Sequence, residues 1–355
     1  MASAQRTRPE ALQAFTEAVL RAEGVPGPDA HLLADTLVTA ELWGHASHGM
    51  LRLPWYVARL RSGAMERVTR TERVRDTGAL VVLDGRNGIG QVITDQAVTL
   101  GVQRAREYGV SAIGIRNSGH FGTAAYFTRK AADEGCVAFL CTNASPAMAP
   151  WGGRNKSVGT NPWSIAAPAG RHGTVVMDLA NTAVARGKVY LAAERGTEIP
   201  EGWAADADGN PTTDPRSAIE GLILPMAGPK GYVISFMFDV LAGVLTGSAF
   251  GTDVAGPYHP DAPSGVGHLL LTIDVAAMGD PAAYAERAEA LVDATRSAET
   301  AAWADRILVP GELEDQNLAA NAVAGITLTA TTWTSLVTLA AETQVDLPPT
   351  EELAA

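Results

Sequence analysis

Three side chains spaced four residues apart could act together on one small anion, namely His48, Arg52 and Tyr56. On a continuous helix this spacing would align them on one face, although Pro54 interrupts such a helix. A histidine can move a proton near neutral pH, and an arginine can hold a carboxylate through two parallel hydrogen bonds. The segment therefore suits a small anionic substrate. The alternative is a helix start capped by Ser47, with the charged side chains in solvent.

Further polar clusters follow predicted strands or precede a predicted helix. His120 lies among glycines that allow a ligand to approach the backbone closely. The segment Thr142–Gly153 is rich in small and hydrogen-bonding side chains, and residues 178–180 end another strand. Lys230 stands at a helix start, where an ammonium group and free backbone N–H groups both favour a phosphate. Each cluster taken alone could equally be a turn with structural hydrogen bonds.

The sequence lacks the common signatures of other chemistries. Neither G-x-G-x-x-G nor G-x-x-x-x-G-K-[ST] occurs, so it carries neither a Rossmann fingerprint nor a P-loop. The segment His45–Gly49 resembles a nucleophile elbow but lacks its first glycine. His45 and His48 could form half of a zinc site, but no third ligand follows at a recognisable spacing. We therefore predict no metal.

The composition is that of an acidic globular protein. Of 355 residues, 46% are apolar and 19% are charged, and 27 Lys and Arg against 39 Asp and Glu give a net charge of −12. Because no basic block occurs, we expect neither nucleic acid nor an anionic membrane surface as a partner. If Cys136 and Cys141 end one strand, they lie about 16 Å apart, too far for a disulfide. Reduced thiols and an N-terminus without an apolar signal region predict a cytoplasmic protein.

Hydrophobic periodicity predicts the elements that position these clusters. Helical spacing covers residues 9–43 with a break at 25–28, then residues 50–61, 94–108, 121–134 and 284–297, and a stretch from 313 onward. Short strands are expected at residues 80–83, 110–115, 137–140, 175–177 and 269–275. This alternation is typical of the α/β class with a sheet of mixed direction. We interpret residues 145–174 as loops and short strands, and residues 195–215 as a long surface loop.

One apolar stretch, residues 231–251, imitates a membrane helix. Asp239 lies at its centre, where a charge costs about 2.5–3.5 kcal/mol in a bilayer, and no basic clusters flank it. We therefore predict a buried core helix over residues 231–246 and no membrane partner.

Taken together, the clusters resemble one known family. The malate/L-lactate dehydrogenase family of NAD(P)-dependent oxidoreductases contains segments similar to GHASHGMLRLPWYVARLRSG, NSGHFG, TNASPAMAPWGG, GTNPWSIAAPAG, VMDLANTAVARGK and PEGWAADADGNPTTDP. That family is distinct from the Rossmann-type lactate and malate dehydrogenases. It includes ureidoglycolate, sulfolactate and diketogulonate enzymes and cyclic imino-acid reductases. The resemblance is dense over residues 10–250 and weaker beyond, where Pro310-Gly311-Glu312 is still recognisable.

The resemblance implies a non-Rossmann α/β fold with a mixed sheet and a helical N-terminal region, a homodimer, and NAD or NADP as cofactor. By motif position, His48, Arg52 and His120 would serve substrate binding and proton transfer. The cofactor would contact Ser145, Asp178, Leu179, Ala180, Lys230, Pro310, Gly311 and Glu312. The sequence departs from the family pattern at Pro229, where an aromatic residue usually precedes the lysine, and in the Ala- and Thr-rich part after residue 251.

We therefore predict an oxidoreductase that moves a hydride to or from C2 of a small 2-oxo or 2-hydroxy acid. Arg52 would hold the substrate carboxylate, and His120 or His48 would exchange the proton. The alternatives are a reductase of a cyclic imino acid and, less favoured, a non-catalytic binding protein on the same fold.

Four parts of the chain are expected. Residues 1–65 would be the N-terminal helical part of a substrate and dimerisation domain, and residues 66–130 a small α/β domain. Residues 131–280 would bind the nucleotide. Residues 281–355 would be a C-terminal helical part that packs back on the N-terminal region.

Overall fold

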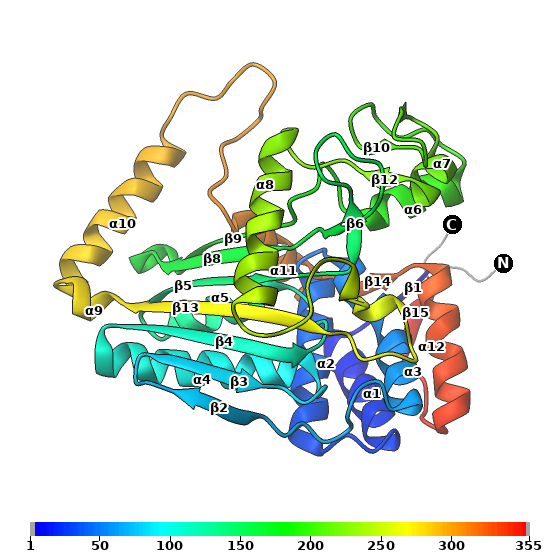
Figure 1. Ribbon diagram of the computed structural model, residues 1–355, viewed down its shortest axis with the longest axis horizontal. Helices are drawn as coiled ribbons and strands as arrows, with labels where there is room; N and C mark the ends of the chain where they lie inside the picture. Colours follow the sequence, from blue (N-terminus) through cyan, green and yellow to red (C-terminus); the bar gives the residue numbers. More distant parts are fainter. Residues whose placement is uncertain (1–3, 353–355) are drawn as a thin grey trace.

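A mixed seven-stranded sheet organises the computed structural model, which describes residues 4–352 (Figure 1). Its strand order is β2-β3-β4-β13-β5-β8-β9. Strands β3 and β4 are parallel, and all other neighbours in this sheet are antiparallel. The strands are β2 (Glu72–Asp76), β3 (Leu80–Asp84), β4 (Val110–Ser118), β5 (Cys136–Thr142), β8 (Trp163–Pro168), β9 (Thr174–Leu179) and β13 (Val266–Asp274). Strands from residues 66–130 and from residues 131–280 thus share one sheet.

Helices cover both faces of this sheet (Figure 1). The helices are α1 (Pro9–Ala22), α2 (Gly27–Leu42), α3 (Leu53–Ser62), α4 (Gly90–Tyr108), α5 (Ala124–Asp133), α6 (Arg186–Arg195), α7 (Pro215–Glu220), α8 (Pro229–Phe238), α9 (Val275–Met278), α10 (Pro281–Arg296), α11 (Glu312–Ala324) and α12 (Ala330–Thr343). Helices α4 and α5 pack on one face, where Val98 and Phe127 meet Ile113 and Leu140. Helix α8 lies over the other face. The predicted α/β class with a mixed sheet is confirmed.

Successive side chains of strand β5 alternate between the two faces of the sheet and pack into the apolar layers on both sides. Cys136, Ala138 and Leu140 point into the core beneath α4 and α5, whereas Cys141 packs with Phe238 on the opposite face. Both cysteines are buried and free. The prediction of two separate core thiols is therefore confirmed.

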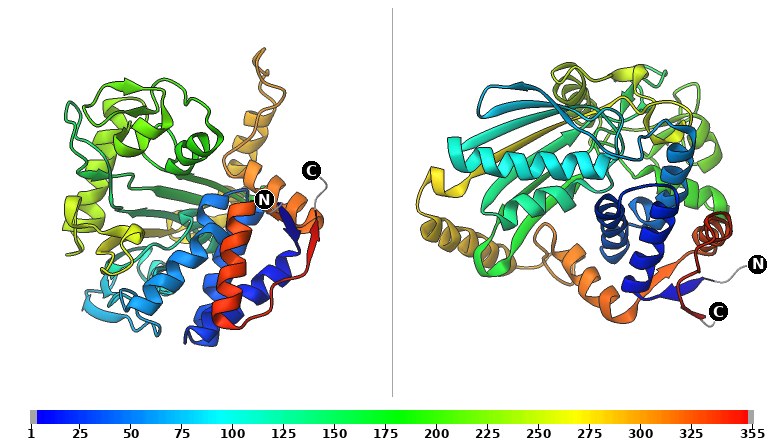
Figure 2. Two further views of the ribbon diagram at one scale, coloured as in Figure 1. Left: turned by 90° about the vertical axis from the view of Figure 1, so that its right-hand side faces the viewer. Right: turned by 90° about the horizontal axis from the view of Figure 1, so that it is seen from below.

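The N-terminal and C-terminal helices form a second layer beside the sheet. Helices α1, α2, α3 and α12 share one core, which contains Leu12, Phe15, Val19, Leu53 and Leu336. Figure 2 shows α12 beside the N-terminal helices, and strand β1 (Gln5–Thr7) pairs with both β14 (Ile326–Leu328) and β15 (Thr350–Glu352). The two ends of the described chain are therefore tied together, and they support the loop that carries His48 and Arg52.

The predicted helix over residues 231–246 is present, but it is only partly buried and is not a regular α-helix throughout. Helix α8 ends at Phe238 and continues as a π-helical turn over Asp239–Val244. Ser235 and Phe238 are buried, but Val233 and Phe236 remain about half exposed, because only one side of the helix reaches the sheet. No helix among residues 4–352 is both long and apolar enough to cross a membrane.

Residues 195–215 form a largely exposed, turn-rich segment as predicted, and two two-residue strands interrupt it. This segment belongs to a small lobe with its own apolar core, in which Val189, Ile199, Ala204 and Ile223 meet. The lobe combines α6 and α7 with the short strands β10 (Ala204–Ala205), β11 (Pro211–Thr212) and β12 (Leu222–Ile223). Its apolar residues are too scattered in sequence to show a period. A further pair, β6 (Pro146–Met148) and β7 (Val158–Gly159), crosses the predicted loop region that follows β5.

Candidate active site

Two successive 3₁₀ turns carry His48 and Arg52 between α2 and α3. The turns span Ala46–His48 and Met50–Arg52, and Pro54 stands in the first turn of α3. The expectation that His48, Arg52 and Tyr56 share the face of one helix is therefore wrong. Only Tyr56 lies on α3, since a proline fits a helix start and not its interior.

A buried carboxylate fixes the position of these turns. Glu41 on α2 accepts a hydrogen bond from the backbone N–H of Met50 at 2.8 Å. A side chain at Gly49 would place its Cβ only 2.3 Å from Glu41 Oε1, so the turn requires glycine there. Burial raises the pKa of Glu41 to about 7. Sequence reasoning missed Glu41, because a single glutamate in a helical pattern carries no signal of what it contacts.

Arg52 is oriented by its own segment. Its Nε donates to the backbone oxygen of Ser47 at 2.6 Å, and its guanidinium lies over the ring of Trp55 at 4.0 Å. Stacking and a hydrogen bond together restrict the planar group, which is how arginine is prepared for bidentate binding of an oxyanion.

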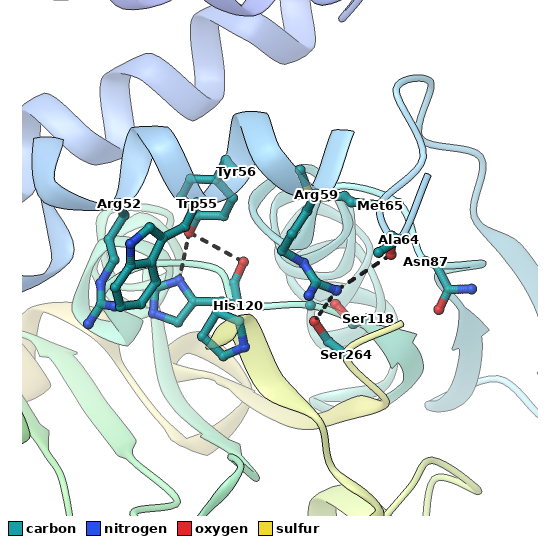
Figure 3. A pocket seen from close by; sticks show the side chains of 13 residues that line it. Arg52, Trp55, Tyr56, Arg59, Ala64, Met65, Asn87, Ser118, His120 and Ser264 are labelled. Carbon is teal, nitrogen blue, oxygen red and sulfur yellow. Dashed lines mark hydrogen bonds between the residues drawn. The ribbon is translucent and has the colours of Figure 1, made fainter. Parts of the chain in front are cut away.

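His120 lies in the loop between β4 and α5 and faces Tyr56 (Figure 3). Tyr56 Oη lies 2.6 Å from His120 Nδ1, and Gln91 Nε2 donates to Tyr56 Oη at 2.7 Å. The backbone N–H of Gly122 also donates to Nδ1, at 3.3 Å. The imidazole rings of His48 and His120 stack with their centroids 5.7 Å apart. Three segments distant in sequence thus meet around one histidine.

Both histidines are neutral at physiological pH. Burial, together with the positive charge of Arg52, lowers the pKa of His48 to about 3. The same two causes hold the pKa of His120 well below its usual range. A second proton on either ring would place a cation next to Arg52 in a partly enclosed site, which is unfavourable.

These residues line a cavity of about 320 Å³, the size of a small-molecule site. Of the predicted site residues, it brings together His48, Arg52, His120, Ser145, Asp178 and Ala180. We call the wall formed by His48, Arg52 and His120 the histidine side. The wall formed by Ser145, Asp178, Ala180, Thr123 and Thr182 is the cofactor side.

The cofactor side presents two buried hydroxyl groups without protein partners and one buried carboxyl group. The Oγ1 atoms of Thr123 and Thr182 are buried and have no hydrogen-bond partner within residues 4–352. Asp178 accepts a hydrogen bond from the backbone N–H of Ala125 at 2.8 Å, and burial raises its pKa to about 6. Buried hydroxyl groups of this kind need a partner. The amide and ribose groups of a nicotinamide nucleotide would supply one, so these residues fit such a cofactor. Sequence reasoning missed both threonines, although each lies within four residues of a predicted cluster.

The remaining predicted cofactor residues lie outside this lining. Leu179 and Lys230 are exposed, the latter in the first turn of α8. Pro310 and Gly311 lie against β9, where the oxygen of Pro310 accepts from the N–H of Val176 at 3.2 Å. Glu312 pairs with Arg296 at 3.4 Å. From helix α11, Glu314 contacts a residue of the cavity lining, with its Oε1 atom 3.4 Å from Nε2 of His45.

The fold is a non-Rossmann α/β fold, and its cavity places two neutral histidines and an arginine opposite a wall suited to a nicotinamide nucleotide. Together these features define a class of dehydrogenases. Residues 7–337 match the malate/L-lactate dehydrogenase family, so the chain belongs to that family and is an NAD(P)-dependent oxidoreductase. The alternative of a non-catalytic binding protein is set aside.

Characterised relatives agree with this assignment. The (2R)-3-sulfolactate dehydrogenase (NADP(+)) of Chromohalobacter salexigens is 43% identical over 78% of this chain and 83% of its own. The Delta(1)-pyrroline-2-carboxylate/Delta(1)-piperideine-2-carboxylate reductase of Pseudomonas putida is 36% identical over 79% of this chain and 83% of its own. The solved structure of sulfolactate dehydrogenase from Methanocaldococcus jannaschii has a TM-score of 0.91 and 34% identity, and covers 96% of this chain and 98% of its own.

Proposed function

We propose that this enzyme transfers a hydride between NAD(P) and C2 of a small anionic 2-oxo or 2-hydroxy acid. The observation that carries the proposal is that Arg52, His48 and His120 line the same cavity as Ser145, Asp178 and Ala180. The bound dihydronicotinamide supplies the hydride. Arg52 holds the substrate carboxylate, because its guanidinium is already oriented by Ser47 and Trp55.

Of the two histidines, we assign proton exchange to His120. Its Nδ1 is occupied by Tyr56 and Gly122, whereas its Nε2 has no hydrogen-bond partner among residues 4–352 and is left for the substrate. His48 contacts Ser47 Oγ through Nδ1 at 3.0 Å and stacks on His120. We assign His48 the role of shaping the substrate pocket next to Arg52.

We assign the cofactor to residues 131–280, with the nicotinamide end against Ser145 and residues 178–180. An open groove lined by Ser145, Arg186 and His259 continues from the cavity and gives the rest of the dinucleotide room. Lys230 and residues 310–312 would contact parts of the cofactor further from the reacting carbon. Residues 1–65 and 281–355 would complete the substrate side, and residues 66–130 would form a small α/β unit.

A second candidate function is reduction of a cyclic imino acid. It is supported by the relative from Pseudomonas putida, whose name states that activity. Arg52 and His120 would keep their roles, since an imine also bears a carboxylate and needs one proton in addition to the hydride.

We also propose that the enzyme is a cytoplasmic homodimer. The outer face of α8 exposes Phe236 by 50% and Met237 by 49%, and Leu245 in the next turn by 65%. A second copy would cover this apolar face. Two buried free thiols fit a reducing compartment. Light scattering tests the dimer, and Phe236→Glu should shift it toward the monomer.

The experiment that tests the activity is a screen of 2-oxo acids and cyclic imines that follows oxidation of NADH and NADPH separately. We expect turnover of at least one small carboxylate of one class with at least one of the two cofactors. No oxidation of either cofactor by any member of either class would contradict the proposal.

A further inference from the structure

The hydrogen bonds around His120 determine which of its ring nitrogens carries the proton. The backbone N–H of Gly122 can only donate, so Nδ1, which accepts from it, must hold a lone pair. A neutral imidazole then carries its single proton on Nε2. The hydroxyl of Tyr56, 2.6 Å from Nδ1, must be a donor as well.

The bond to Gln91 agrees with this assignment. Because Tyr56 gives its only proton to His120, its oxygen must accept the second hydrogen bond that it makes. Gln91 Nε2 donates exclusively and lies 2.7 Å away. The chain of donors therefore runs in one direction, from Gln91 to Tyr56 to His120 Nδ1, and leaves the proton of the ring on Nε2. Figure 3 shows the contact between Tyr56 and His120.

This arrangement makes a simple acid role for His120 difficult. A second ring proton on Nδ1 would make His120 an imidazolium, which burial and the positive charge of Arg52 disfavour. A neutral imidazole that gave up its Nε2 proton without compensation would become an imidazolate, a far stronger base. His120 can therefore protonate a substrate only if Nδ1 receives a proton in the same step.

We propose that Tyr56 lends this proton, so that two protons move together when the substrate is reduced. This inference rests on the proposed role of His120. As the substrate carbon receives the hydride, the Nε2–H bond breaks and the substrate oxygen or nitrogen gains that proton. The Tyr56 O–H bond breaks as an N–H bond forms at Nδ1, which leaves a neutral imidazole and a phenolate.

After the product leaves, water in the cavity protonates Nε2, and Nδ1 returns its proton to Tyr56. One solvent proton is consumed per turnover.

The surroundings of Tyr56 can stabilise a brief phenolate. The side chain is 4% exposed, and Gln91 keeps donating to its oxygen. Arg59 lines the same small pocket as Tyr56 and is buried (Figure 3). Its hydrogen bonds go to neutral groups, among them the backbone oxygens of His259 and Ala262, and no carboxylate in the described side chains pairs with it. A buried cation without an anion is a ready partner for a transient negative charge.

The phenolate does not accumulate between turnovers. Burial raises the pKa of the Tyr56 hydroxyl, so the resting enzyme keeps the phenol. The substrate oxygen or nitrogen gains negative charge as the hydride arrives, which makes it a stronger base than a phenolate, so it still draws the proton through His120.

The test compares Tyr56→Phe with the wild-type enzyme in mixtures of H₂O and D₂O. For the wild type we expect a solvent isotope effect on kcat that bends with deuterium fraction, because two protons move in the transition state. For Y56F we expect kcat to fall about 10- to 100-fold, part of the range for general acid–base catalysis, and the plot to become linear. A dissociation constant for the cofactor that stays unchanged would separate this effect from a general disturbance.

A pH profile gives a second readout. The charged and titratable groups around His120 are Arg52, Arg59, His48 and His268. Burial and the positive charges of Arg52 and Arg59 disfavour the imidazolium, whereas His48 and His268 are neutral because burial lowers the pKa of each to about 3. Without Tyr56, only the imidazolium can act as an acid. The reduction rate of Y56F should therefore fall as pH rises, whereas that of the wild type should stay flat across neutral pH.

Tyr126→Phe is the matched control. The hydroxyl of Tyr126 donates a hydrogen bond to Asp35, so this variant also loses a hydrogen-bonded hydroxyl. Tyr126 lies outside the cavity lining. It should keep kcat within twofold. If Y56F fails to fold, an enzyme with 3-fluorotyrosine at position 56 is tested in its place. The hydroxyl of 3-fluorotyrosine is more acidic than that of tyrosine, so kcat should rise above that of the wild type.

The outcomes separate the two proposals. If His120→Asn abolishes turnover while Y56F keeps wild-type kcat and a curved plot, the role of Tyr56 is wrong. An unchanged kcat with 3-fluorotyrosine contradicts it equally. If His120→Asn itself leaves turnover intact, the proposed role of His120 fails first.

Discussion

On the histidine side of the cavity, every group that would touch substrate is already held by the protein. His120 is bound by Tyr56 and Gly122, and Arg52 by Ser47 and Trp55. On the cofactor side, the hydroxyls of Thr123 and Thr182 have no partner within residues 4–352. The first wall is therefore preorganised for chemistry, whereas the second keeps its donors for a ligand.

Because the two walls differ in this way, substitutions on them should change different kinetic constants. Changes on the histidine side should lower kcat or raise the KM for substrate while the cofactor still binds. Changes on the cofactor side should weaken cofactor binding more than they slow turnover at saturation.

The largest effect is expected at His120. His120→Asn should lower kcat by about 100- to 10,000-fold, because it removes the group that exchanges the proton. Steady-state kinetics at saturating cofactor measures this loss, and fluorescence titration should give a cofactor dissociation constant close to that of the wild type. His48→Asn is the comparison variant. A larger loss of kcat in His48→Asn than in His120→Asn would reverse the assignment of the two histidines.

Arg52→Lys should have the next largest effect. The planar guanidinium binds a carboxylate through two hydrogen bonds, and a lysine ammonium cannot reproduce this geometry. We expect KM for the substrate to rise about 100-fold, the equivalent of one or two charge-assisted hydrogen bonds. Initial-rate measurements over a range of substrate concentrations check this. An unchanged KM would remove Arg52 from the substrate site.

Glu41→Gln should change stability rather than chemistry on the histidine side. Burial raises the pKa of Glu41 from 4.5 to about 7, so the folded protein holds this proton over a pH range in which the unfolded chain has released it. Wild-type stability therefore falls as pH rises from about 4.5 to 7. Glutamine avoids this cost, and at pH 8 the variant should be more stable by at most about 3 kcal/mol. Urea unfolding of both proteins at pH 5 and pH 8 measures the difference. A gain that does not grow with pH would show that the carboxylate is not buried as described.

Lys230→Ala should have the smallest effect, confined to the cofactor. Its ammonium is exposed in the first turn of α8, so solvent screens any contact with a phosphate. We expect the cofactor dissociation constant to rise about tenfold, the lower end for a lost charge-assisted hydrogen bond, with kcat at saturation little changed. Titration of NADH and NADPH into both proteins tests this. Equal constants would place Lys230 outside the cofactor site.

Much of the local structure was predictable because it depends on residues close together in sequence. The helical spacing of Leu12, Phe15 and Val19 predicts α1, and the short apolar run over residues 136–141 predicts β5. Over residues 231–246 the mainly apolar composition predicted the helix correctly but not how much of it is buried. Burial there depends on which side of α8 meets the sheet, and an apolar run does not encode that choice.

The sequence by itself determined the chemistry available to this protein. It supplies His48, Arg52 and His120, and their motifs assign the chain to a family whose members use NAD(P). Residue types, short spacings and turn glycines are local properties, and a linear pattern contains them in full.

Only the tertiary structure decided how those groups work. Tyr56 and Gln91 meet His120 from separate helices, and the buried side chain of Glu41 accepts a hydrogen bond from the turn before α3. Thr123 and Thr182 become binding groups only because folding buries them without a partner. Protonation state and orientation depend on burial and on neighbours distant in sequence, and neither exists until the chain has folded.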